Sequence, residues 1–158
     1  MSRDILLYES GDGGNLLVAN NDISLVESLF QQCYLALFGG NIEVNTTGNE
    51  LDSQIREDWW GNTLFNDKNI NKQFNSNTER TLDSVALNTA GRIAIERAVD
   101  DDLKLLRNIA NFTIKVIILS TNRVKIEILM LRPDKFQDKS YQFIWDNASN
   151  EVITEIII

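Results

Sequence analysis

The sequence predicts a single α+β domain in which two main helices pack on a small, mostly antiparallel sheet, with an N-terminal β-hairpin. The chain has 158 residues, of which 43% are hydrophobic and 24% are charged, and this suffices for one domain with a buried core. Apolar residues recur at helical spacing in the first two thirds and alternate as in strands in the last third. Because no internal repeat or boundary divides residues 1–158, we expect residues 133–158 to be a C-terminal β extension of the same domain.

Two features of the composition exclude whole classes of chemistry. The chain has no histidine and one cysteine, Cys33. This excludes Ser-His-Asp and Cys-His catalysis, an internal disulfide and a cysteine-based zinc site. We therefore predict no catalytic, cofactor-binding or metal-ligating residues. No apolar run reaches the roughly 18 residues of a membrane-spanning helix, and the N-terminus lacks the apolar region of a signal peptide, so we expect no membrane partner.

The negative charge is concentrated near the N-terminus. The net charge is −8, and residues 1–60 hold Arg3 and Arg56 against ten acidic residues, whereas the remainder is balanced. Such a surface repels phosphate backbones, so we expect no nucleic-acid partner. The acidity either provides solubility or matches a basic partner surface.

The N-terminal segment predicts a β-hairpin. Residues 5–8 and 15–19 are short apolar runs on either side of the glycine-rich residues 10–14. This turn lacks the lysine and serine or threonine of a phosphate-binding loop, and no helix follows it directly.

Residues 22–38 predict the first helix, because their apolar residues fall on one face at spacings of three and four. Ser24 and Glu27 fit a capping box, and Asn21 or Asp22 could cap the helix instead. Cys33 lies on the apolar stripe and is expected in the core.

Gly39 and Gly40 end this helix, and residues 41–58 are expected to form a polar loop. Trp59 and Trp60 follow, before an asparagine-rich stretch at 66–78. Adjacent side chains of an extended strand face opposite ways, so we expect one tryptophan to pack inward and the other to make a surface contact.

Residues 79–99 predict the second helix. The triplet Asp100–Asp102 precedes another apolar stretch at 103–110, and either caps a second short helix there or binds a cation. Capping is favoured because the triplet lacks the spacing of a calcium loop.

The C-terminal third predicts strands at 112–119 and 124–131, followed by a hairpin of 141–145 and 151–158. The last strand is unusually apolar, with isoleucines at four positions: Ile153, Ile156, Ile157 and Ile158. This strand either completes the sheet or docks on another subunit by strand addition.

The order of these features resembles the small baseplate wedge family of contractile phage tails, particularly its Mu-type branch, within the lysozyme-like wedge superfamily. The resemblance covers residues 3–132. The pieces that carry it are Leu7-Tyr8 with the glycine-rich turn, Val26–Phe38, Arg56 with Trp59-Trp60-Gly61-Asn62, Thr81–Val99, and Phe112–Leu131.

The resemblance implies a structural role in the tail baseplate, in a virion assembled in the cytoplasm of the host bacterium. Wedge proteins of this family bind other wedge subunits and present a platform for the first ring of tail sheath subunits, in part through exchanged strands. The chain alone is then expected to be a monomer or a weak oligomer. The residues expected at its interfaces are Trp59, Trp60, Ile153, Ile156, Ile157 and Ile158.

Two other functions are compatible with the sequence. One is a glycosidase with paired carboxyl groups, for which Glu57 and Asp58 beside the tryptophans are the best local candidates, although no second carboxyl partner is evident. The other is a soluble adaptor of similar fold that binds one protein partner, since a fold does not fix a function.

Overall fold

The computed structural model describes residues 3–9, 14–40, 64, 73–133 and 138–158. The helices are α1 (Ser28–Phe38), α3 (Asn77–Ser84) and α4 (Thr89–Leu103), and the last continues into the 3₁₀ turn η3 (Lys104–Leu106). The N-terminal strands are β1 (Arg3–Ile5), β2 (Leu7–Glu9), β3 (Gly14–Leu16), β4 (Val18–Ala19), β5 (Asp22–Ile23) and β6 (Leu25–Glu27). The C-terminal strands are β7 (Asn111–Ile118), β8 (Arg123–Leu131), β9 (Lys139–Asp146) and β10 (Glu151–Ile157).

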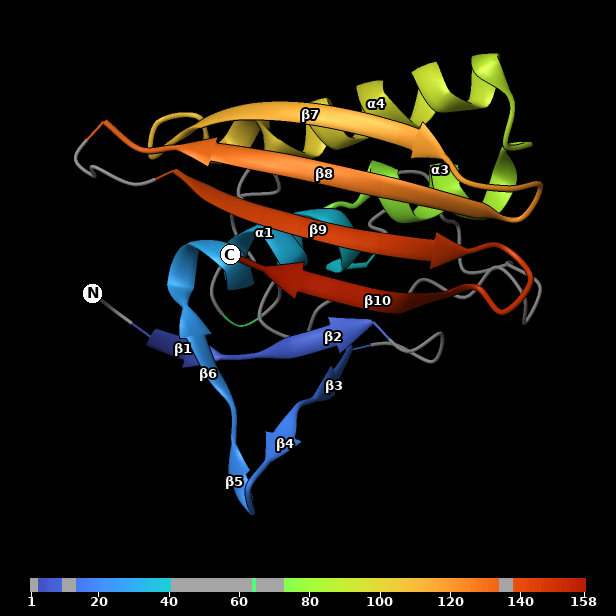
Figure 1. Cartoon of the computed structure of the whole chain (residues 1–158). Coiled ribbons are helices and arrows are strands. Elements are labelled where there is room, and N and C mark those ends of the chain that lie inside the picture. The colour runs from blue at the N-terminus through green and yellow to red at the C-terminus, as the bar shows by residue number, and fades with distance from the viewer. Residues whose placement is uncertain (1–2, 10–13, 41–63, 65–72, 134–137) are drawn as a thin grey trace.

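The four C-terminal strands form one antiparallel sheet in the order β10-β9-β8-β7 (Figure 1). The predicted strand pairs are therefore confirmed, and their bounds move by two residues at most. Branched and aromatic side chains alternate along each strand, so one face of the sheet is apolar. The residues buried on that face are Phe112, Val116, Val124, Ile126, Ile128, Met130, Tyr141, Phe143 and Trp145.

All three helices lie on the apolar face of this sheet, and the other face is open to solvent (Figure 1). The described part of the chain is therefore mixed α+β, with three helices where the sequence predicted two. Phe38, at the end of α1, contacts Phe143 and Trp145 with ring centroids 5.4 and 6.1 Å away. Cys33 is fully buried, as predicted, and burial raises the pKa of its thiol to about 12.

The first helix begins at Ser28, so the prediction of a helix from residue 22 is wrong. Asn20 and Asn21 both adopt positive φ, at 53° and 62°, and this backbone makes the tight turn of a β-hairpin between β4 and β5. The chain then returns as β6, whose Leu25 pairs with Ile5 of β1.

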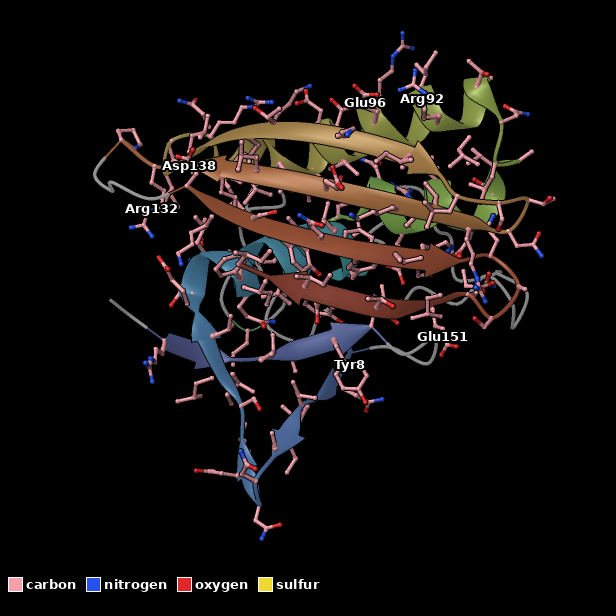
Figure 2. All side chains as sticks on the ribbon, viewed as in Figure 1. Tyr8, Arg92, Glu96, Arg132, Asp138 and Glu151 are labelled. Carbon is pink, nitrogen blue, oxygen red and sulfur yellow. The ribbon has the colours of Figure 1, made fainter. Side chains whose placement is uncertain are left out.

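The predicted capping box is wrong for the same reason. Glu27 itself occupies the position before the helix and makes no capping hydrogen bond through its side chain. Its carboxylate instead forms an ion pair with Arg132, which follows β8 (Figure 2).

The second predicted helix is two helices, α3 and α4, so the single helix over 79–99 is wrong. The break lies at residues 85–88, where Asn88 caps α4 by accepting a hydrogen bond from the Gly91 amide at 3.0 Å. Gly91 also permits this tight connection, because a Cβ there would lie 2.0 Å from the Ala86 carbonyl oxygen.

The acidic triplet does not cap a following helix. Asp100, Asp101 and Asp102 belong to the last turns of α4 itself. Asp102 is buried and accepts hydrogen bonds from the amides of Asn77 and Thr78, at 3.0 and 2.7 Å. The prediction that the triplet caps a helix after residue 102 is therefore wrong, and Asp102 instead accepts hydrogen bonds from the first turn of α3, a contact that the sequence did not indicate.

The predicted N-terminal hairpin is confirmed as β2 and β3, where Leu7 pairs with Leu16 and Glu9 with Gly14. It belongs to a set of three short antiparallel ribbons, β1-β6, β2-β3 and β4-β5. The ribbons lie to one side of the four-stranded sheet, beyond β10 (Figure 1). Of these, the β4-β5 ribbon projects furthest from the helices.

Candidate partner-binding edge

The predicted interface residues lie in two different parts of the chain. Trp59 and Trp60 lie outside the described residues, as do Glu57 and Asp58, the pair of acids considered for catalysis. The four isoleucines of the C-terminal strand are described, and they all lie on or directly after β10.

Strand β10 forms one edge of the four-stranded sheet. It pairs along its length with β9, and Ile158 continues the pairing through two backbone hydrogen bonds with Ser140, at 2.8 and 2.9 Å. The last strand thus completes the sheet, which was the first of the two alternatives from the sequence. On its other side, β10 contacts β2 without forming a ladder with it.

A β-bulge at Ile153 decides which side chains of β10 face the core. The register shifts between Val152 and Thr154, so Ile153 has no residue opposite it on β9. Beyond the bulge, Glu155 lies opposite Phe143, and Ile157 lies opposite Tyr141, on the apolar face.

The outward side chains of β10 are apolar and exposed. Ile156 and Ile158 alternate with the core-facing residues, and they are 42% and 66% exposed. Ile153, at the bulge, is 40% exposed, whereas Ile157 packs against the core. Three of the four predicted isoleucines are therefore available to a partner.

Further into the sheet, the outward face of β8 and β7 carries charged side chains, in contrast to the apolar outward face of β10. Glu127 on β8 pairs with Lys125 at 2.7 Å and with Lys115 of β7 at 3.7 Å. The hydrogen bond from Lys125 lowers the pKa of Glu127 below its ordinary value. The outward face of the sheet is therefore apolar at β10 and charged at β7 and β8.

Two carboxyl–tyrosine pairs lie beneath β10. Tyr34 of α1 donates a hydrogen bond to Glu9 of β2, with 3.1 Å between the oxygens, and Glu9 is buried. Tyr141 of β9 donates a hydrogen bond to Glu155. The first pair joins the N-terminal ribbons to α1, and the second ties β10 to its neighbour.

Burial sets the titration of these groups. It raises the pKa of Glu155 above its ordinary value, and the hydrogen bond from Tyr141 opposes this only in part. Burial first, and then the charge of Glu9, raise the pKa of Tyr34. No local pattern in the sequence marks this cluster, because its four members come from four elements that only the tertiary structure brings together.

Glu155 is expected to make the protein more stable as the pH falls from neutral toward about 4. Its folded-state pKa exceeds its unfolded-state pKa, so the folded state holds the proton more tightly. The stability that protonated Glu155 contributes is fully present below the pKa of this residue in the unfolded chain. It is lost as the pH rises through the higher pKa of Glu155 in the folded protein. The free energy of unfolding of the Glu155→Gln variant, relative to wild type, should therefore rise with pH, as measured by urea denaturation.

The Glu151→Gln variant, at the start of the same strand (Figure 2), controls for the loss of one negative charge. Parallel pH profiles for wild type and Glu155→Gln would show that Glu155 titrates alike in the folded and unfolded states.

A groove of about 410 Å³ lies between α4 and β7. Its acidic residues are paired: Glu96 with Arg92 at 3.0 Å (Figure 2), Asp100 with Arg107, and Asp101 with Lys104. The acidic side chains of the groove are thus neutralised by basic neighbours at a solvent-exposed surface.

Among the described residues, no three or more acidic or cysteine side chains gather in a way that could hold a metal ion. None of the helices in the described ranges is long and apolar enough to cross a membrane.

No protein-family model, no curated protein and no solved structure matches the chain. Among the predicted interface residues, the exposed isoleucines of β10 lie in the described part of the chain.

Proposed function

We propose that this protein is a structural, non-enzymatic subunit that binds other proteins through the outward side of β10. The observation that carries the proposal is the exposure of Ile153, Ile156 and Ile158 on a strand held firmly in the sheet. Exposed apolar side chains on an edge strand favour aggregation unless a partner covers them. Because β2 contacts β10 on the side away from β9, a partner would cover these side chains from the solvent face of the sheet, through apolar contacts rather than by pairing with the β10 backbone.

More specifically, we propose an inner wedge subunit of the baseplate of a contractile phage tail or a phage-like injection particle. The support is the resemblance carried by the order of elements and by Arg56 with Trp59 and Trp60. On this proposal the partners are other wedge proteins and the first ring of sheath subunits. The excess negative charge of residues 1–60 would then face basic surfaces of those partners.

The experiment uses the full chain and the sheath subunit from the same genome. Removing β10 entirely would also remove the core contacts of Ile157 and the Glu155–Tyr141 bond, so substitutions are preferable to truncation. The Ile156→Lys/Ile158→Lys double variant changes only outward side chains. We expect it to bind the sheath subunit at least ~10-fold more weakly than wild type in calorimetry, with an unchanged circular dichroism spectrum.

The matched control is the Leu105→Lys/Leu119→Lys double variant, which adds the same two charges at exposed leucines outside β10 and should leave binding unchanged. Equal binding by wild type and the double variant would exclude the β10 surface as the interface. If wild type binds neither sheath nor wedge proteins, the adaptor function replaces the baseplate function.

A further inference from the structure

The three N-terminal ribbons meet at a three-way junction. Leu6, Leu17 and Ser24 lie at its centre, and each donates one backbone hydrogen bond and accepts one. The Leu6 amide bonds to the Ser24 carbonyl at 2.9 Å, and the Ser24 amide bonds to the Leu17 carbonyl at 2.8 Å. The Leu17 amide closes the cycle on the Leu6 carbonyl at 3.2 Å. Each bond continues the register of one ribbon, so all three ladders run into the junction.

This register places side chains of one kind, all apolar, on the same face of the three joined ribbons. Successive residues of a strand face opposite ways, so the residues on either side of each central residue share a face. The six positions that follow from this rule are all apolar: Ile5, Leu7, Leu16, Val18, Ile23 and Leu25. The opposite face is mixed, with Asp4, Asn15 and Asp22 opposite or beside Tyr8, Ala19 and Val26.

Five of these six side chains are exposed. Leu7 lies against the core, whereas the others are 40 to 62% exposed. We call these five residues the junction face: Ile5, Leu16, Val18, Ile23 and Leu25. Their exposed surface amounts to roughly 400 Å², as large as the largest apolar patch of a typical monomer. A two-stranded ribbon alone is marginally stable in water, so an apolar cover would stabilise it.

We infer that the junction face binds the same face of a second copy of this chain. Sheets with apolar faces pack on one another at a spacing of about 10 Å, and two copies supply two such faces. The five residues carry no charge, so two chains of net charge −8 can meet there without placing like charges in direct contact. Two junction faces together bury roughly 800 Å² of apolar surface, which with the flanking backbone fits a weak dimer.

The inference concerns the chain on its own and stands apart from the function proposed for β10. Repulsion between two negatively charged chains opposes the dimer, and salt screens that repulsion while leaving apolar contacts intact. The dimer should therefore tighten as ionic strength rises. A contact made by charge complementarity with a basic protein would weaken instead.

The test is sedimentation velocity of the full chain from about 5 to 200 µM, at about 0.05 and 0.5 M NaCl. We expect a dimer that strengthens with salt, and the Val18→Glu/Ile23→Glu variant should dimerise at least ~10-fold more weakly. The matched comparison is between Val18→Glu and Ala19→Glu, which each add one charge to the same ribbon, on the junction face and on the opposite face; the Ala19 variant should dimerise at least half as well as wild type.

Three outcomes would overturn the inference. If the wild-type chain stays monomeric at the highest concentration, the junction face does not bind a second copy, and a different protein would have to cover it. A dimer that survives the double substitution lies elsewhere on the surface. A dimer that Ala19→Glu weakens as much as Val18→Glu does depends on net charge, and not on the junction face. None of these outcomes bears on the binding of sheath through β10.

Discussion

The Asp102→Ala variant is expected to lose about 3 to 5 kcal/mol of its free energy of unfolding. The carboxylate is 4% exposed and accepts four hydrogen bonds, from the amide and side chain of Asn77 and from the amide and side chain of Thr78. Alanine leaves these donors at the start of α3 without their partner, and Thr78 is fully buried. Urea denaturation followed by circular dichroism measures the loss.

Asp101→Ala is the matched control, because the neighbouring carboxylate is exposed and pairs with Lys104 at the surface. That variant should stay within about 0.5 kcal/mol of wild type. The free energy of unfolding of Asp102→Asn should lie between those of the two alanine variants. The carbonyl oxygen of the new side chain can still accept hydrogen bonds from Asn77, but its NH2 group would face the Thr78 amide, which is also a donor. Equal stability of the Asp101 and Asp102 variants would contradict the capping role.

The Phe38→Ala variant is expected to lose about 3 to 5 kcal/mol of its free energy of unfolding, because a buried aromatic ring leaves a cavity. Phe38 is one of the residues through which α1 contacts the sheet, as is Cys33, whose sulfur lies 3.7 Å from that of Met130. Its ring lies 5.6 Å from that of Tyr34, on its own helix, and within about 6 Å of the rings of Phe143 and Trp145. Near-ultraviolet circular dichroism should lose intensity along with stability.

Phe38→Leu keeps most of the apolar volume and should cost about 1 to 1.5 kcal/mol. If leucine and alanine destabilise the protein equally, the aromatic contacts rather than the filled volume hold α1 on the sheet. If neither change matters, α1 is held by its other buried residues.

The parts of the fold that follow short-range rules could be predicted from the sequence. Strands β7 and β8 alternate branched side chains around a turn, and both were found within a residue. The start of α1 could not be found in this way, because residues 22–27 are apolar at helical spacing yet pair with β1 and β4. The asparagines at 20 and 21, which form the hairpin turn, were the local signal for this pairing.

The candidate site was predictable in location but not in orientation. The run of isoleucines identified the last strand, but the bulge at Ile153 decides that Ile156 faces solvent and Ile157 faces the core. A one-residue shift of this kind exchanges the two faces of a strand, and no local preference in the sequence marks it. The junction face was missed because it unites three ribbons whose register is a tertiary property.

The ion pair between Glu27 and Arg132 joins residues 105 positions apart. Strand β2, near the start of the sequence, likewise contacts β10, near its end. During synthesis on the ribosome, the N-terminal ribbons and α1 therefore emerge long before β9 and β10, which complete their contacts. Proteins whose contacts join residues far apart in the sequence fold slowly. Segments made early keep apolar surface exposed until their partners have been synthesised. The N-terminal ribbons and α1 of a newly made chain should thus keep their apolar surface exposed until residues 139–157 have left the exit tunnel.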